Sequence, residues 1–581
     1  LGQRCAYDFT LKNADEASIA NKSLFVKAKH QVNDNWQVWA NASVNQTESF
    51  GRYAPVPDSS YLSTPLSANS PNNPTNPNGH VYDPSLGLDP QAVNWWHRFD
   101  ALGNRDTTVT SQMTDLLIGT TGQIGDAEVE FGLRHTNNRS GQVGRNFMLR
   151  SAAFEHIESG AYDLSNPYGS SESILNSMRV TTYRDSKYDQ DEIFGSVAFD
   201  IFEMENGAVS ALIGAEARKD KYADIYDPLS ESGQIGGSTG NSAAGNREID
   251  SLFFEVLVPL MADLEMNIAG RYDDYSDFGS NFSPKVSFRY QPLDKLTLRA
   301  SFNEGYMAPQ LPYVTKRPLV STIFVNDPSK CPNFNPCPFQ ITETTQTNLE
   351  LKAEDTEQFS LGLDYSPTDW VNISLDYYNI QVNNRIRFFN AQAVINADVF
   401  DELPSGLSCI RNSNGIIIEC ITGFSNQGKV ETSGLDLNAQ FDFEILGGHI
   451  TSNLILSHLL DLSVNSGTDF IHSDGFPQQR SIFNNLYRYS DWSIAYDINM
   501  IGSQYDYIIE GEERGHVPTW VTHDLQLNYQ TPWNGKITLG AKNIGEKAPP
   551  IGLGQIRQRE YDFNLYDGFG RITYLRYTQT F

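Results

Sequence analysis

The chain has 581 residues, of which 39% are hydrophobic, and its 71 acidic side chains outnumber 42 basic ones to give a formal net charge of −29. Such acidity argues against a nucleic-acid-binding protein, which recruits basic surfaces. No stretch approaches the run of about 18 to 20 apolar residues that a transmembrane helix needs, which excludes a helical membrane protein. No linker or shift in composition divides the chain, and its length exceeds that of one ordinary soluble core. These properties favour one large structure whose interior is not a dry core, such as a wide barrel.

Alternating apolar and polar residues recur along the whole chain and predict β-strands rather than helices. The clearest segments, in chain order, are 24–32, 36–44, 209–218, 296–303, 435–443 and 492–500. In the fourth segment Leu298 and Phe302 share one face, and Arg299 and Asn303 share the other. Several runs are longer than the average of about 5 to 6 residues in soluble sheets. We therefore expect an all-β fold, a transmembrane antiparallel β-barrel with lipid outside and a wet lumen inside.

The connections between these segments alternate between short and long. The short ones lie at Asn33–Asn35, Gly125–Asp126, Glu205–Gly207, Leu293–Lys295, Thr368–Asp369 and Trp533–Gly535, and the long ones at 54–106, 145–187, 225–245, 310–355 and 388–427. Outer-membrane barrels have short periplasmic turns at one end and long external loops at the other. A soluble β-sandwich gives no comparable reason for this asymmetry, so the pattern favours the barrel.

The number of strands is informative about the ends of the barrel. From residue 18 onwards the chain offers about nineteen strands, the last of them at 571–581. Bacterial single-chain barrels have an even number of strands and both termini in the periplasm. We therefore expect residues 1–581 to be one barrel domain that is incomplete at its N-terminal end. The strands at 18–33 and 571–581 should then lack their proper neighbours and should not close a regular barrel together.

The five cysteines point to an oxidising compartment. Cys331 and Cys337 are six positions apart, and Cys409 and Cys420 are eleven apart, both pairs in polar, turn-rich stretches where a loop can fold back on itself. Neither pair has the CxxC spacing of a zinc site. We predict two local disulfides. Cys5 has no partner in this scheme, and we expect its partner in a further external loop upstream.

No short catalytic motif is present. The sequence has no HExxH, GxSxG, GxxxxGK[ST] or strand-linked GxGxxG, so we expect neither an enzyme nor a resident metal or cofactor. The segment YDDYSDFGS at 272–280 carries several carboxylates, for which a solvated hairpin tip and a Ca²⁺ site are both open.

The long loop 54–106 holds the first candidate ligand site. It contains NWWHRF at 94–99, and Trp95, Trp96 and His97 could form a stacking platform for a sugar or an aromatic ligand. Packing within the loop, or a place in an interfacial aromatic girdle, is the other interpretation.

Five segments resemble, in order, motifs of the TonB-dependent outer-membrane receptors. They are FNEGYMAPQLPYV (302–314), NLELKAEDTEQFSLGLDYSP (348–367), LDYYNIQVNNRI (375–386), GKVETSGLDLNAQF (428–441) and VPTWVTHDLQLNYQTPWNGKITLGAKNIGEKAP (517–549). Near the start, CAYDFT (5–10) and GRYAPVP (51–57) resemble one proteobacterial branch of the same family. No single motif is specific, but five in register are, and the resemblance covers essentially the whole chain.

The resemblance implies a barrel of about 22 strands around a plug folded in the lumen. This chain would then hold about nineteen of those strands and lack the plug. The resemblance also implies a location in the outer membrane of a Gram-negative bacterium, among its lipid and lipopolysaccharide. The expected partners are TonB with its inner-membrane energising complex, acting through the missing N-terminal part, and the barrel-assembly machinery. That machinery would recognise the C-terminal strand, which ends on Phe581, although Gln579 departs from the usual apolar choice.

Polar residues on the inner faces of the expected strands form the second candidate site. Those singled out are Arg299, Asn303, Glu304, Asp436 and Asp442, which could contact the plug or line the path of a ligand. A hydrated barrel wall needs polar residues in any case, so a purely solvated role is the alternative for each.

The functional hypothesis is energy-coupled, TonB-dependent uptake of a scarce nutrient that is bound by the external loops. A ferric siderophore, cobalamin and an oligosaccharide all remain open as ligands, and the aromatic, Asn-rich loops favour the oligosaccharide. A passive porin-like or adhesin barrel is the alternative function.

Overall fold

The computed structural model describes the chain except residues 1–6, 9–10, 15–16, 61–64, 239, 316–317, 330–338, 400–402, 414, 466–467, 474, 506–507, 510–511, 514, 552–560 and 581. Strands dominate the described part, and no helix in it is long and apolar enough to cross a membrane.

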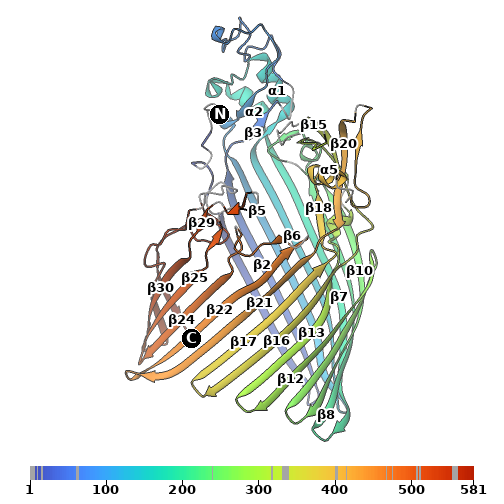
Figure 1. Cartoon of the computed structure of the whole chain (residues 1–581), viewed down its shortest axis with the longest axis vertical. Helices are drawn as coiled ribbons and strands as arrows, with labels where there is room; N and C mark the ends of the chain where they lie inside the picture. The colour runs from blue at the N-terminus through green and yellow to red at the C-terminus, as the bar shows by residue number, and fades with distance from the viewer. Residues whose placement is uncertain are drawn as a thin grey trace.

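One antiparallel sheet forms the body of the molecule, and its strands lie side by side in chain order (Figure 1). Within the described residues this sheet has 21 strands, of which β9 (Ile235–Gly236) and β23 (Thr468–Asp469) have two residues each. Nineteen long strands remain, and the predicted number is confirmed. The long strands are β1 (Ser18–Asn33), β2 (Trp36–Tyr53), β5 (Arg105–Ile124), β6 (Ala127–Leu149), β7 (Arg179–Met204), β8 (Gly207–Tyr226), β10 (Ala243–Met261), β11 (Leu264–Tyr275), β12 (Gly279–Leu293), β13 (Leu296–Met307), β16 (Glu354–Thr368), β17 (Val371–Asn383), β21 (Val430–Ile445), β22 (Gly448–Val464), β24 (Gln479–Tyr489), β25 (Trp492–Ile501), β30 (Trp520–Gln530), β31 (Gly535–Lys542) and β32 (Ile572–Gln579).

The expected asymmetry of the connections is also confirmed. All the predicted short turns lie at one end of the sheet, and the long connections lie at the other end (Figure 1). At the end with the long connections, β11 and β12 differ from the other pairs of consecutive long strands in the described part of the chain, because they join through a short tip, residues 276–278. Strand β7 has 26 residues. Since about 9 to 11 residues cross a bilayer, β7 and its neighbours rise well beyond the membrane on the loop side.

The two faces of the sheet differ in chemistry. Large apolar side chains are exposed along one face of successive strands, among them Leu24, Ile118, Leu133, Ile193, Leu252, Phe282, Leu298, Phe302, Phe359, Leu375, Ile494, Leu527, Leu539 and Leu575. The opposite face carries ion pairs, such as Arg134 with Asp115 at 2.8 Å and Arg271 with Glu216 at 3.0 Å. A barrel in lipid turns its apolar band outward and its polar face toward the lumen, so we call these the outward and lumen faces.

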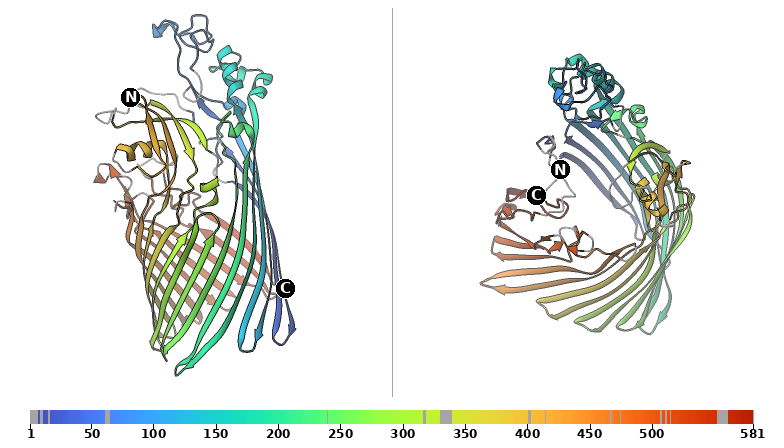
Figure 2. Two further views of the ribbon diagram at one scale, coloured as in Figure 1. Left: turned by 90° about the vertical axis from the view of Figure 1, so that its right-hand side faces the viewer. Right: turned by 45° about the horizontal axis from the view of Figure 1, so that its top comes forward.

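The sheet is open between its first and last strands. Within the described part of the chain β1 pairs only with β2, and β32 pairs only with β31. Figure 2 shows the resulting gap, with β1 and β32 on its two sides. The expectation that these two strands do not pair with each other is thus confirmed. That further strands precede residue 18 in the full-length protein stays a prediction.

The long connections fold into compact units above the sheet. The first joins the β2–β5 and β6–β7 loops and contains β3 (Pro57–Ser59), β4 (Trp96–Arg98), η1 (Pro84–Leu86), η2 (Asp100–Leu102), η3 (Pro167–Gly169), α1 (Arg150–Ser159) and α2 (Glu172–Met178), around a hydrophobic core that includes Phe99 and Tyr162. We call it the first loop unit. Short elements elsewhere on this side are α3 (Pro228–Glu231), β26 (Gln504–Tyr505), β27 (Ile508–Ile509), β28 (Glu512–Glu513) and β29 (His516–Val517).

A second loop unit comes from the β13–β16 and β17–β21 connections. Strands β14 (Leu319–Val325), β15 (Phe339–Gln346), β18 (Ile386–Phe389), β19 (Ser408–Arg411) and β20 (Ile417–Asn426) form a separate five-stranded sheet, against which α5 (Ala391–Val399) packs. The pairing of β15 with β20 is parallel and joins the two loops.

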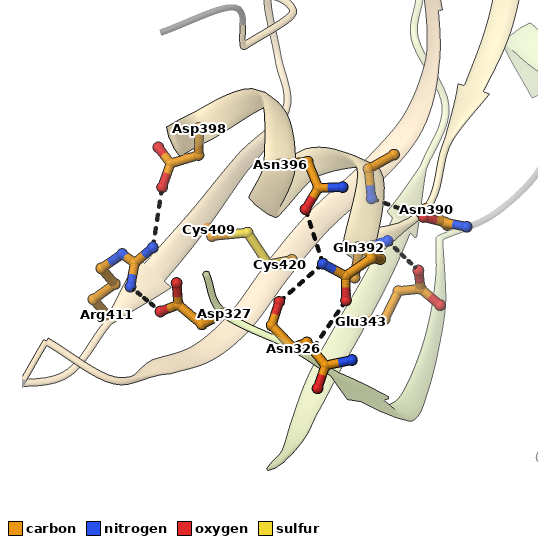
Figure 3. Close-up of a disulfide and its surroundings, with 12 residues drawn as sticks. Asn326, Asp327, Glu343, Asn390, Gln392, Asn396, Asp398, Cys409, Arg411 and Cys420 are labelled. Carbon is orange, nitrogen blue, oxygen red and sulfur yellow. Dashed lines mark hydrogen bonds and ion pairs between the residues drawn. A yellow bond between two sulfur atoms is a disulfide. The ribbon is translucent and has the colours of Figure 1, made fainter. Parts of the chain in front are cut away.

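The disulfide between Cys409 and Cys420 lies in this unit and links β19 to β20 (Figure 3). The predicted pairing of these two cysteines is confirmed. Close to it, Arg411 contacts the buried Asp327 at 2.5 Å and Asp398 at 3.3 Å. Burial alone would raise the pKa of Asp327, but the Arg411 guanidinium and the hydrogen bonds from Ser329 hold this pKa below its ordinary value.

The other cysteine predictions fall on Cys5, Cys331 and Cys337. All three lie outside the described residues, so the disulfide between Cys331 and Cys337 and the upstream partner of Cys5 stay predictions.

Candidate functional site

A pocket of about 450 Å³ opens on the lumen face at the external mouth of the barrel. Its wall comes from β6, β7, β8 and β10, and its roof is the short helix α4 (Leu311–Thr315), which follows β13. The residues that matter most for its chemistry are Arg184, Tyr188, Tyr222, Arg247, Gln310 and Leu311. We call this the mouth pocket.

Helix α4 is held against the wall by a close backbone approach. The Thr315 hydroxyl forms a hydrogen bond with the Tyr222 hydroxyl, and it also donates to the Leu311 carbonyl at 2.7 Å. A Cβ placed on Gly245 would lie 2.7 Å from the Thr315 methyl carbon. Since such a distance is shorter than a carbon contact allows, only glycine at position 245 lets α4 come this near to β10.

Arg247 ties three chain segments together at the pocket. Its guanidinium donates to both Asp277 oxygens, the shortest contact being 2.6 Å, and to the Pro309 carbonyl at 2.7 Å. The rings of Tyr275 and Phe278 lie 5.3 and 5.4 Å from it. Arg247 thereby joins β10, the β11–β12 tip and the segment before α4. It also gives the carboxylate of Asp277, in the acidic 272–280 segment, an arginine partner.

A second arginine faces the same pocket with more exposure. Arg184 donates to the two Asp224 oxygens at 2.6 and 2.8 Å, and its guanidinium lies 4.8 Å from the Tyr226 ring. Its side chain is 38% exposed, so a ligand can reach it beside its carboxylate partner. Arginines in such a setting favour planar, anionic oxygen ligands.

Three aromatic rings on the mouth side extend this chemistry. Tyr313 of α4 stacks on Phe424 of β20 with ring centroids 3.9 Å apart, and Phe388 of β18 lies 5.2 Å from Phe424. Phe388 is 46% exposed. The second loop unit is therefore attached to α4 through ring contacts that also present apolar surface to a ligand.

The sequence-predicted platform is divided by the structure. Trp95 is buried, and His97 packs edge-on against Phe99 at 4.9 Å, whereas Trp96 is 66% exposed. His97 Nε2 lies 2.9 Å from the Tyr162 hydroxyl. Trp95 thus belongs to the core of the first loop unit, the half-buried His97 packs against Phe99 and Tyr162 of that core, and Trp96 is the most exposed of the three.

Burial decides the protonation of the groups in this core. It lowers the pKa of His97 to about 4, although the nearby Asp100 opposes the shift, and it raises the pKa of Tyr162. His97 therefore stays neutral at ordinary pH.

Two of the predicted lumen residues meet in one row of the wall. Arg299, Gly362, Asp376 and Asp436 are successive cross-strand partners on β13, β16, β17 and β21. The Arg299 guanidinium passes across Gly362 to reach Asp376 at 3.0 Å, and a Cβ on Gly362 would lie 2.3 Å from the Asp376 oxygen. A side chain at position 362 would therefore have to displace the ion pair between Arg299 and Asp376.

The other three predicted lumen residues lie apart from that row. Asn303 and Glu304 are consecutive in the regular pairing of β13 with β16, so they point to opposite faces and at most one of them faces the lumen. Asp442 is near the short β21–β22 turn, where it accepts from Thr451 at 2.7 Å and lies 3.5 Å from His449.

Sequence reasoning did not find the mouth pocket. Its residues come from four strands, from the five-residue helix α4 and from Gln310 just before that helix, and those on the strands stand in no compact motif. The only local signal was the segment 302–314, which resembles a family motif and contains α4.

Residues 61–544 match the family model described as TonB dependent receptor-like, β-barrel. Two curated relatives give the scale of the similarity. The ferric enterobactin receptor PirA of Pseudomonas aeruginosa is 27% identical over 225 residues, which are 36% of this chain and 28% of that protein. The probable TonB-dependent siderophore receptor PirA of Acinetobacter baumannii is 26% identical over 182 residues, 30% of this chain and 23% of that protein. The chain thus matches less than a third of the length of either relative.

Solved structures share the fold at low identity. A mutant of the ferric enterobactin receptor PfeA of Pseudomonas aeruginosa superposes with a TM-score of 0.61 at 15% identity, covering 98% of this chain and 71% of that one. The siderophore receptor PirA of Acinetobacter baumannii gives 0.57 at 16% identity, covering 97% and 71%. The family model spans well over half of the sequence, and the chain belongs to the TonB-dependent receptor-like β-barrel family.

Proposed function

We propose that this chain is the barrel of a receptor that takes up a scarce nutrient across the outer membrane, with energy delivered through TonB. Barrels of this family lie in the outer membrane of Gram-negative bacteria, and so does this chain. The family consists of receptors and transporters rather than enzymes, and in the proposed function the ligand crosses unchanged. The observation that carries the proposal is the mouth pocket of a family barrel, where two arginines and several rings face the entrance.

The ligand we place first is a ferric siderophore. Arg184 suits an anionic oxygen, and Tyr188, Tyr222 and Phe388 offer ring surface to an aromatic iron chelate. Relatives of the chain are named as receptors for ferric enterobactin. The alternative ligands are an oligosaccharide, which the composition of the loops favours, and cobalamin. Trp96, beside Trp95 and His97 in the first loop unit, is a proposed second contact for the ligand.

The partners follow from the same proposal. TonB and its energising complex would act through a part of the receptor outside these 581 residues, and strands from that part would complete the sheet between β1 and β32. The assembly machinery would recognise the last strand, and lipid with lipopolysaccharide would surround the outward face. Polar groups of the lumen wall, including Arg299 and Asp436, would contact a plug.

The test is uptake of ⁵⁵Fe-loaded siderophore by cells that express the full-length receptor in place of their own. We expect uptake to disappear when TonB is deleted, and Arg184→Gln to weaken ligand binding at least tenfold. The matched control is Arg139→Gln, because Arg139 forms the same kind of pair with Asp185 at 3.1 Å on the outward face of β6.

Two outcomes would contradict the proposal. Uptake that persists without TonB, together with a large ion conductance of the full-length protein in planar bilayers, would favour the passive barrel. Equal effects of the Arg184 and Arg139 variants on binding would remove the mouth pocket from the ligand path.

A further inference from the structure

Another pocket, of about 410 Å³, lies on the lumen face of β10 to β17, toward the end of the barrel with the short turns. Ten residues of β10 separate Arg247 in the mouth pocket from Leu257 in this one. That separation is about 34 Å along the strand, and about 26 Å along the membrane normal at a tilt of about 40°. We call it the deep pocket.

Positive charges are concentrated in the deep pocket, although the whole chain has a net charge of −29. Arg289 of β12 and Arg299 of β13 are direct cross-strand partners, and Lys285 lies four residues from Arg289 on the same strand and face. Like charges directly opposite each other destabilise a sheet. An anion held in the pocket would offset this repulsion.

Carboxylates neutralise only two of these three cations. Arg299 lies 3.0 Å from Asp376. Arg289 lies 3.8 Å from Glu265, and its side chain is 48% exposed. The exposed Lys285 ammonium forms no ion pair or hydrogen bond with any other described residue. Lys285 and Arg289 are therefore the two cations that a ligand in the deep pocket can reach most readily.

A further arginine lies between the two pockets. Arg271 of β11 is the cross-strand partner of Phe253, which is six residues from Arg247 along β10. Its guanidinium donates to Asp273 at 2.8 Å and to Glu216 at 3.0 Å, and its side chain is 38% exposed. Cations thus follow one another down the lumen face from the mouth pocket to the deep pocket, at intervals of about 20 Å or less along the strands.

We propose that the deep pocket is a transit site, which binds the anionic ligand after it leaves the mouth pocket and before it reaches the periplasm. This inference rests on the proposed function, and the pocket becomes accessible once a plug has moved. Lys285 and Arg289 bind the anionic oxygens of the ligand, and further hydroxyl donors line the pocket at Ser287, Ser301 and Ser360.

The distance between the pockets determines what a change in the deep pocket affects. Charge interactions are screened within about 8 Å at physiological ionic strength, so the cations of the deep pocket do not attract a ligand that is still at the mouth. Removing them should lower the rate of transport and leave the first binding step unchanged.

The experiment separates first binding from passage in cells that express the full-length receptor in place of their own. The probe is a ⁵⁵Fe-labelled tris-catecholate chelate, which is an aromatic anion. Its equilibrium binding is measured in the cold, and its initial uptake rate at growth temperature. We expect the double variant Lys285→Gln and Arg289→Gln to bind the chelate as the wild type does and to lower the maximal uptake rate about tenfold, because two charge-assisted contacts are lost.

Two matched variants control for charge and shape. Arg139→Gln with Lys219→Gln removes the same charge from the outward face and should change neither quantity. Lys285→Arg with Arg289→Lys keeps the charges in the deep pocket and should keep the wild-type rate. Gel mobility before and after heating confirms that each variant is folded.

The possible failures are distinguishable. Equal, TonB-dependent uptake rates of the wild type and the double Gln variant in the deep pocket would overturn the transit site alone. Weaker first binding by this variant would also overturn it, because the two cations would then act at the entrance. A raised ion conductance of this variant in planar bilayers would assign the cations to contact with a plug instead. Wild-type uptake that is absent, or that persists without TonB, would overturn the proposed function and this inference with it.

Discussion

Replacing Leu437 by arginine tests the assignment of the outward face most directly. Leu437 lies in β21 opposite Leu375 of β17 and Leu456 of β22, so it forms part of an apolar row. The adjacent Asn438 is on the lumen face, opposite Ser374 and Ile455. The two positions share a strand and a depth and differ only in the face they occupy.

The depth of Leu437 can be worked out from the strand geometry. Near the short turns, the rings of Trp370 and Phe443 contact each other at 6.2 Å, as expected for an aromatic girdle at the periplasmic interface. Six residues separate Phe443 from Leu437, which is about 20 Å along the strand and about 15 Å along the membrane normal at a tilt of about 40°. The apolar band is about 25 Å tall, so Leu437 lies near its middle.

An arginine facing lipid at this depth costs about 2 to 4 kcal/mol, whereas one in a wet lumen costs much less. The assay is the free energy of unfolding of the full-length protein in vesicles, from urea titrations followed by tryptophan fluorescence. We expect Leu437→Arg to lose that amount and Asn438→Arg to lose less than about 1 kcal/mol. Equal losses, or the greater loss at Asn438, would refute the face assignment of β21.

Three further predictions concern the parts above the membrane. Cys409→Ser should lower the stability of the second loop unit by about 2 to 3 kcal/mol, because the disulfide closes a short ring, while the barrel keeps its gel mobility; peptide mapping without reduction should recover Cys409 joined to Cys420. His97 has its pKa lowered to about 4 in the folded unit, so the unfolded state binds more protons between that value and the ordinary 6.5. Stability of the first loop unit should therefore be full above pH 6.5 and fall by about 3 kcal/mol as the pH drops toward 4, which hydrogen exchange of the loop amides measures. If the exchange rate of these amides, corrected for intrinsic chemistry, did not change with pH, this prediction would be wrong. We expect His97→Phe to abolish the pH dependence of the stability of the first loop unit. Arg247→Met should release the segment before α4, seen as faster proteolysis between β13 and β16 with an unchanged barrel core.

The strands were predictable because their signal is local. A period of two, repeated over many residues, assigns Leu298 to one face and Arg299 to the other without knowledge of any partner. The loop units lack such a signal. His97 meets Tyr162 across 65 positions of sequence, and α4 reaches β10 only because position 245 is a glycine. Such contacts depend on tertiary distances, so the sequence could suggest an aromatic site at 94–99 and could not show that Trp95 is buried and that the half-buried His97 packs against Phe99 and Tyr162.

The ion pair that crosses Gly362 bears on how the sheet selects its register during assembly. A slip by one residue between β13 and β16 would turn every apolar side chain toward the wrong face, and the lipid would reject it. A slip by two restores the faces, so hydrophobicity alone does not distinguish it from the correct alignment. A slip that sets Ser360 in the place of Gly362 would, however, carry both carboxylate partners of Arg299 away from it, Asp364 at 3.3 Å and Asp376 at 3.0 Å in the native alignment. The alternating pattern fixes the face that each side chain occupies. The ion pair of Arg299 across Gly362 adds a preference for one register among those that keep the faces.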